Sequence, residues 1–269
     1  MRALLHGPAH SDLDILVVCA QTDDPVPADL PNLRYVSIPQ HDIFAARATG
    51  VALATGEIVA LLEDHAVPDP SWATELLAAW DKHSEADAIV HTARTGPKAK
   101  AWELALFVLT FGPFLGVSKA PRDRIPIPGM VSFRRSLLPS STPPVGWLEY
   151  DFLARLASEQ RMVMAPAMSL LHLQPVGWKA PVLSFASGRM YAGSAATHKS
   201  LSRRLQVRRV RGDTRVIIQQ TFSARKRINN GEVGLRFAAC ALAVIAANLC
   251  GQLVNIATRS VGKSAAKLQ

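Results

Sequence analysis

The triplet Glu63-Asp64-His65 places two carboxylates and an imidazole directly after the apolar run Glu57–Leu62. Carboxylate oxygens and imidazole nitrogens are ligands for divalent cations, and a divalent cation can neutralise the negative charge of a bound or leaving phosphate group. Considered alone, three polar residues of this kind are more typical of a solvated turn. The elements around the triplet must therefore decide between a metal site and a turn.

These elements predict an α/β sheet with the triplet at the carboxyl end of a strand. Asp14–Ala20 and Arg34–Ile38 are short β-branched runs typical of buried strands, and the alanine-rich segment Asp42–Thr55 predicts a helix that stops at Gly56. Glu57–Leu62 then predicts a strand whose carboxyl end carries the triplet. Open α/β sheets bind their ligands at that end of the strands.

After the triplet, Asp69 and Pro70 predict the N-cap and first residue of a helix over Ser71–His83. Later segments predict further elements of the same α/β domain. They are a strand at Ala88–His91, a helix at Ala101–Val117, an amphipathic helix at Glu149–Gln160, and strands at Met162–Met164 and Ser169–Leu171.

The run from Ala45 to Trp80 resembles the central block of family 2 glycosyltransferases, in which an ARNxG helix leads through a strand to an acidic metal motif and then P-x-P-x-W. The resemblance implies the α/β fold called GT-A, a nucleotide-sugar donor, and Mn²⁺ or Mg²⁺. By position, Glu63 faces the donor ribose, while Asp64 and His65 lie at the metal. Glu and His replace the outer residues of the usual D-x-D motif, and imidazole is a poor ligand for Mg²⁺.

The same resemblance assigns two further residues on the donor side. Arg47 lies near the donor diphosphate, although an Arg on an alanine-rich helix can equally be a surface residue. His172, after the last core strand, completes the metal or diphosphate site, or else is a structural histidine.

On the acceptor side, Pro126–Arg135 is similar to the family's PGxNxxFRR segment. An inverting transfer needs a carboxylate to deprotonate the acceptor hydroxyl. The family's pattern places Glu149 at this position, with Asp151 as the alternative; both can also simply cap the helix. Since no Q-x-x-R-W motif occurs, the resemblance favours transfer of a single sugar over processive synthesis.

The sequence departs from the family at its start, because no strand of the VSVVIPxYN type precedes Asp14. That strand normally cradles the nucleobase. Two hypotheses follow: an active glycosyltransferase, or a catalytically impaired, membrane-tethered remnant with a scaffolding role.

The charge distribution indicates a membrane rather than a nucleic acid. Lys199–Arg236 contains eleven Lys and Arg against two acidic residues, a local balance equal to the chain's net charge of +9, and it precedes the nearly uncharged span Phe237–Thr258. This span is long enough to cross a bilayer, to re-enter it or to lie at its interface. An anionic membrane surface is the expected partner. The excess of positive charge before the span and the lack of a signal peptide predict a catalytic domain on the cytoplasmic face.

The predicted organisation is a catalytic domain over residues 1–175, partial at its N-terminus, followed by a basic helical segment, 176–236. A membrane helix, 237–258, and a tail, 259–269, complete it. The expected fold is a mixed GT-A sheet without its first strand, followed by membrane-associated helices.

Overall fold

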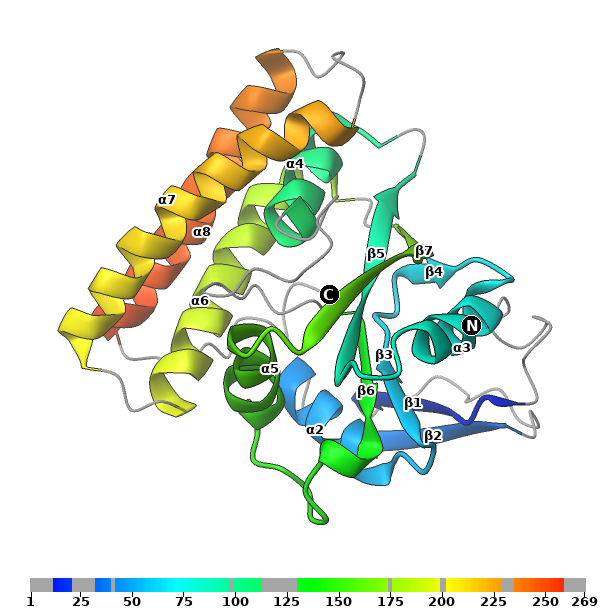
Figure 1. Cartoon of the computed structure of the whole chain (residues 1–269). Coiled ribbons are helices and arrows are strands. Elements are labelled where there is room, and N and C mark those ends of the chain that lie inside the picture. The colour runs from blue at the N-terminus through cyan, green and yellow to red at the C-terminus, as the bar shows by residue number, and fades with distance from the viewer. Residues whose placement is uncertain are drawn as a thin grey trace. The chain divides into compact units, whose positions relative to one another are not determined.

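The computed structural model describes residues 12–20, 32–39, 42–96, 99–112, 130–173, 176–198, 202–228 and 235–258. The chain forms two compact units. Apart from short stretches outside the described residues, the first comprises Met1–Arg94 and Ile127–Leu171, and the second Thr95–Val117 and His172–Gln269. Figure 1 labels the helices and strands of both units.

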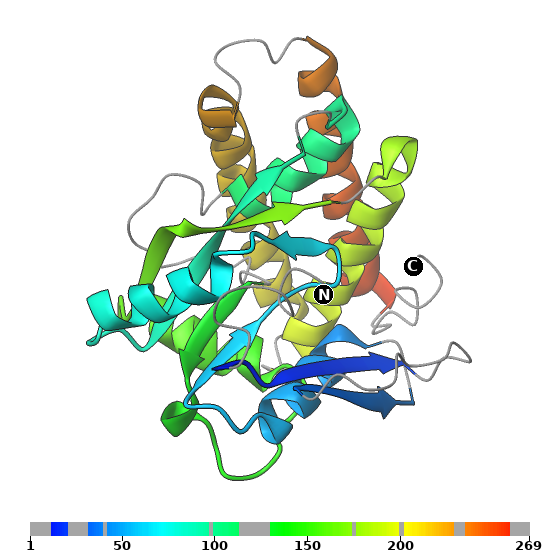
Figure 2. The ribbon, with the colours of Figure 1, turned by 90° about the vertical axis from the view of Figure 1, so that its right-hand side faces the viewer.

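The first unit begins with a pair of parallel strands, β1 (Ile15–Ala20) and β2 (Leu33–Ile38), as the sequence predicts. Figure 2 shows the two blue strands side by side. Helix α2 (Ile43–Leu53) follows, and the Asp42 carboxylate caps it by accepting from the backbone N–H of Phe44 at 2.9 Å. The side chain of Thr55 then donates to Asp14 at 2.8 Å, which ties the end of the helix segment to the start of β1.

A second, five-stranded sheet has the strand order β3-β6-β5-β7-β4. Its strands are β3 (Ile58–Leu61), β4 (Ala66–Pro68), β5 (Ala88–Thr95), β6 (Val131–Arg134) and β7 (Met162–His172). Strand β6 runs antiparallel to both of its neighbours, β3 and β5. Ile89, Val90, Val131 and Phe133 are fully buried on it and form its core.

Two features of this sheet differ from the sequence-based expectation. The three-residue strand β4, directly after the acidic triplet, was not predicted, and the two short strands predicted between Met162 and Leu171 form one continuous strand, β7. Within the described residues, no strand joins the β1–β2 pair to the five-stranded sheet.

Helix α3 (Trp72–Lys82) packs on the sheet through Trp72, Leu76 and Trp80, which share one helical face and are buried. The Trp80 indole N–H donates to the Ser132 hydroxyl at 3.1 Å. The predicted N-cap, Asp69, was wrong: the cap position is Ser71. Asp69 instead accepts a hydrogen bond from Arg94 at 2.7 Å.

The predicted helix at Glu149–Gln160 is not uniform. It opens with a π-helical turn, Leu148–Leu153, and only α5 (Ala154–Ser158) is α-helical. The segment ends at Gln160, whose φ of 58° is left-handed. π-Helical turns are rare and are frequently found at functional sites.

The second unit is helical, with α4 (Ala101–Phe111), α6 (Ala180–His198), α7 (Arg203–Ile228) and α8 (Leu235–Thr258). Helix α4 packs against α8, although the sequence suggested that it packs on the catalytic domain. Figure 1 shows α6 and α8 side by side. At their contact, a Cβ on Gly188 would lie 2.2 Å from the Asn248 carbonyl oxygen, and one on Gly251 would lie 2.1 Å from that of Phe185. Only glycine permits so close an approach of the two backbones.

Among the described helices, α8 is the one long and apolar enough to cross a membrane. The core helix of a soluble protein can have the same length and apolar composition. Helix α7, which carries most of the basic segment, precedes it. The predicted boundaries at residues 175, 236 and 258 stay predictions, and the predicted tail lies outside the described residues.

Candidate functional site

The loop between β3 and β4 carries the acidic triplet at the carboxyl end of β3, as predicted. The His65 ring lies between the two carboxylates: its Nε2 is 3.1 Å from Glu63 Oε2, and its Nδ1 is 2.7 Å from Asp64 Oδ1. Burial alone would lower the pKa of His65, but hydrogen bonds to Asp64 and Glu63 outweigh it and raise this pKa to about 9. The hydrogen bond from His65 also lowers the pKa of Asp64.

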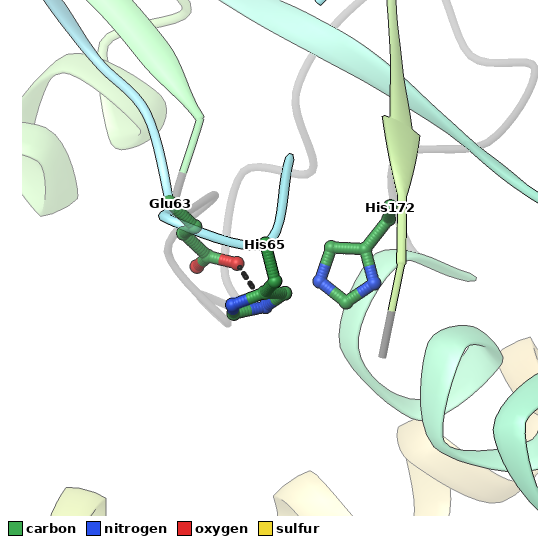
Figure 3. Close-up of side chains that lie close together, drawn as sticks. All are labelled: Glu63, His65 and His172. Carbon is green, nitrogen blue, oxygen red and sulfur yellow. Dashed lines mark ion pairs between the residues drawn. The ribbon is translucent and has the colours of Figure 1, made fainter. Parts of the chain in front are cut away.

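His172 is the last residue of β7, the strand next to β4 in the five-stranded sheet. The boundary between the two units falls inside this strand, just before His172. Figure 3 shows the imidazole of His65 between the carboxylate of Glu63 and the imidazole of His172. One potential ligand atom from each of the three residues lies within 4.8 Å of the others. The His172 ring also packs edge-on against Phe111, with ring centroids 4.8 Å apart.

The residues of this cluster fit a divalent cation. Ligand atoms lie about 2 Å from a small divalent ion, so neighbouring ligands of one ion are about 3 Å apart, and the three side chains must move closer together to reach that spacing. One carboxylate and two imidazoles favour Mn²⁺ over Mg²⁺. Because His65 is protonated at neutral pH, a metal ion must displace that proton to bind there. The Asp64 side chain is 91% exposed and lies outside the three-residue cluster.

Arg47 occupies the buried face of α2, together with Phe44, Ala48 and Val51. Its side chain is only 9% exposed, so the alternative of a surface residue was wrong. Its Nη1 lies 3.3 Å from Glu149 Oε1, and its Nη2 lies 3.5 Å from Glu63 Oε1. The guanidinium therefore connects a carboxylate of the predicted donor side with one of the predicted acceptor side.

Glu149 is completely buried in the π-helical turn, and its Oε2 has no hydrogen-bond partner among the described residues. Burial raises the pKa of Glu149, and the positive charge of Arg47 opposes this rise without cancelling it. Neither Glu149 nor Asp151 caps the helix, because the cap position is Trp147 and no side chain bonds there. Asp151 is exposed. A buried carboxylate with a raised pKa and an unpaired oxygen has the properties of a general base.

The predicted residues thus lie in two overlapping groups. Glu63, His65 and His172 form one, and Arg47, Glu63 and Glu149 the other, so Glu63 belongs to both. Asp64 and Asp151 lie outside these groups, and their assigned roles stay predictions.

One residue near the site was not singled out by the sequence. Asp42, the N-cap of α2, is close enough to Glu149 to raise its pKa. The cap was recognisable, but its distance from Glu149 depends on tertiary structure. Of the acceptor-side segment, residues 126–129 lie outside the described residues, and Arg134 is structural, since it stacks on Trp80 with 5.0 Å from its guanidinium carbon to the ring centroid.

A comparison with known protein families bears on the first half of the chain. Residues 14–140 match the sequence model of glycosyl transferase family 2. This segment, just under half of the chain, is therefore a family 2 glycosyltransferase sequence, and the α/β core to which it contributes is of the GT-A type. No curated protein matches the sequence.

Solved structures give weaker likenesses. One is a mycobacterial protein, 17% identical with a TM-score of 0.43; the match covers 70% of this chain and 65% of that one. Another is glucosyl-3-phosphoglycerate synthase from Mycobacterium tuberculosis in complex with phosphoglyceric acid, 14% identical with a TM-score of 0.41, covering 72% of this chain and 82% of that one. This chain thus spans just under two thirds of the first of these proteins, and TM-scores below 0.5 add nothing to the family assignment.

Proposed function

We propose that this protein transfers a single sugar from a nucleotide-diphosphate donor to a glycan or lipid-linked acceptor, with inversion at the anomeric carbon. The observation that carries the proposal is the contact of Arg47 with both Glu149 and Glu63. It connects a buried carboxylate suited to activating an acceptor hydroxyl with the acidic and histidine residues suited to holding a donor.

In this mechanism Glu149 accepts the proton of the acceptor hydroxyl as its oxygen attacks the anomeric carbon. The bond from that carbon to the donor phosphate breaks on the opposite face, and the nucleoside diphosphate leaves. A base is most effective when its pKa is near the working pH, and the burial that raises the pKa of Glu149 acts in that direction.

Glu63, His65 and His172, with Asp64 beside them, would hold a divalent cation, Mn²⁺ or Mg²⁺. Such a cation supplies positive charge to the leaving diphosphate. The resemblance to the family adds Arg47 and Glu63 as donor-binding residues, with Glu63 facing the ribose.

We also propose that the protein is associated with a membrane and that its first unit lies on the cytoplasmic face. Helix α8 has the necessary length and apolar composition, and the basic helix α7 precedes it. Anionic lipid head groups attract clustered Lys and Arg.

The donor site is tested by calorimetry of nucleoside-diphosphate binding with and without Mn²⁺. His65→Ala should abolish the dependence on Mn²⁺ because it removes a ligand, and Asp64→Asn should weaken it because it removes the negative charge beside that imidazole. Asp69→Asn is the matched control, since this exposed carboxylate pairs with Arg94 instead. Unchanged Mn²⁺-dependent binding in both site variants would refute the metal assignment.

The second candidate function is that of a catalytically impaired, membrane-tethered scaffold. It is favoured by the separation of the β1–β2 pair from the five-stranded sheet in the described part of the chain. A scaffold of this kind would fail to bind nucleoside diphosphates even as the wild-type protein, so the same calorimetry distinguishes the two functions.

A further inference from the structure

Arg47 is a buried cation that contacts two carboxylates from distant parts of the sequence. Glu63 follows β3, and Glu149 lies in the π-helical turn 102 positions beyond Arg47. The two contacts use different amino groups, Nη1 for Glu149 and Nη2 for Glu63. A guanidinium is suited to this arrangement because its planar fork offers several donors in fixed directions, whereas an ammonium group is a single point of charge.

The surroundings of Glu149 require a nearby cation if its carboxylate is to stay ionised. Glu149 is wholly buried, and the carboxylate of Asp42 adds a second negative charge near it. Of the charged groups that face Glu149, Asp42 and Arg47 both come from α2, and Glu63 reaches it through Arg47. An isolated buried carboxylate without a cation would take up a proton, because the charged form is poorly solvated there.

We propose that Arg47 is a positioning residue shared by the two halves of the site: one amino group keeps Glu149 ionised and oriented, while Glu63 anchors the other. Loss of Arg47 removes the positive charge that opposes protonation of the buried carboxylate. Loss of Glu63 frees the guanidinium that orients Glu149. The catalytic consequence rests on the proposed function, whereas the linkage of the three side chains is a property of the folded chain and needs no substrate.

The first test is the pH dependence of thermal unfolding in Arg47→Met, which removes the charge but keeps an unbranched chain. Without Arg47, the pKa of Glu149 in the folded protein rises further above its unfolded value of about 4.3. A group with a raised folded pKa stabilises the protein at low pH and loses that contribution as pH rises through the folded pKa. The Tm difference from wild type should therefore widen between pH 5 and pH 8, by about 3–5 °C per additional pKa unit.

Two further variants separate this effect from a general packing defect. Adding Glu149→Gln to Arg47→Met should remove the widening, since no carboxyl group is left to titrate. Arg47→Lys retains the charge, so its Tm difference from wild type should widen much less than that of Arg47→Met. This variant also provides a test if Arg47→Met does not fold. A Tm difference that stays constant across pH would overturn the proposal.

The shared role is tested by a double-mutant cycle of Glu63→Gln and Glu149→Gln at pH 7. Their effects on unfolding should be non-additive when Arg47 is present and additive in the Arg47→Lys background, because a single ammonium cannot serve both carboxylates. Additive effects with Arg47 present would overturn the link to Glu63. The proposed function fails separately if Glu149→Gln transfers sugar at the wild-type rate although the double-mutant cycle shows the expected non-additive effects.

Discussion

Two pairs of buried or partly buried polar side chains, one in each unit, differ in character. In the first unit, Arg47 and Glu149 are ionisable groups, and one oxygen of Glu149 has no partner in the described structure. At the α6–α8 contact of the second unit, two neutral side chains are hydrogen-bonded: Ser184 donates to the Val244 carbonyl at 2.8 Å, and Asn248 donates to that of Ser184 at 3.1 Å.

The first pair has the properties of groups that take part in catalysis, whereas the second has those of groups that stabilise the packing of two helices. Buried polar groups are normally hydrogen-bonded, so a buried carboxylate oxygen without a partner requires an explanation. Perturbed pKa values and incomplete pairing are typical of catalytic groups. The serine and asparagine between α6 and α8 instead join two helices whose glycines let the backbones touch, as in packed membrane helices. Substitutions at the Arg47–Glu149 pair should therefore impair activity, whereas those at the α6–α8 contact should affect stability alone.

The largest expected effect is that of Glu149→Gln on sugar transfer. Glutamine keeps the size of the side chain but cannot accept the proton, and general-base assistance contributes roughly 10²–10⁴-fold. Transfer rates should fall by about that factor while nucleotide and Mn²⁺ binding stay close to wild type. Asp151→Asn is the control, because this carboxylate is exposed. Loss of transfer in Asp151→Asn but not in Glu149→Gln would move the base to Asp151.

A smaller effect is expected from Gly188→Ala in the second unit. The new Cβ would lie 2.2 Å from the Asn248 carbonyl oxygen, which is a backbone atom, so the two helices must separate. Overpacking of this kind costs about 1–3 kcal/mol. Chemical denaturation should show this loss. Gly96→Ala is the matched control, because its Cβ would meet only the Leu173 side chain, at 3.6 Å. Equal stability of the two variants would mean that α6 and α8 are not in close contact.

The smallest effect concerns the exposed charges of α7. If the basic helix lies on anionic lipid, Arg204→Gln should weaken binding to phosphatidylserine-containing vesicles by about 1 kcal/mol, or roughly fivefold, at low ionic strength. The effect should fade as salt is added, because exposed charges are screened. Substitution is preferable to deletion of α8, which packs against α6, α4 and α7. Arg94→Gln in the first unit is the control, and an equal loss there would indicate nonspecific charge attraction.

The sequence by itself determined the family, the α/β class and the place of the acidic triplet. Strand β3 and helix α2 were predictable because their patterns are local: an apolar run for the strand and an alanine-rich run for the helix, which ends at Leu53 rather than just before Gly56. The position of Glu63-Asp64-His65 at a strand end followed from those elements. The long apolar helix α8 was predictable from composition alone.

Only the tertiary structure decided which of these polar residues lie together. Local patterns gave equal weight to Arg47 as a donor ligand and as a surface residue, whereas its burial between Glu63 and Glu149 depends on segments 16 and 102 positions away. Strand β4 was missed because three residues are too few to show a period, and the π-helical turn because its apolar pattern resembles that of an α-helix. Hydrophobic periodicity determines which face of an element is buried, but only the packing of distant elements determines which charges meet there.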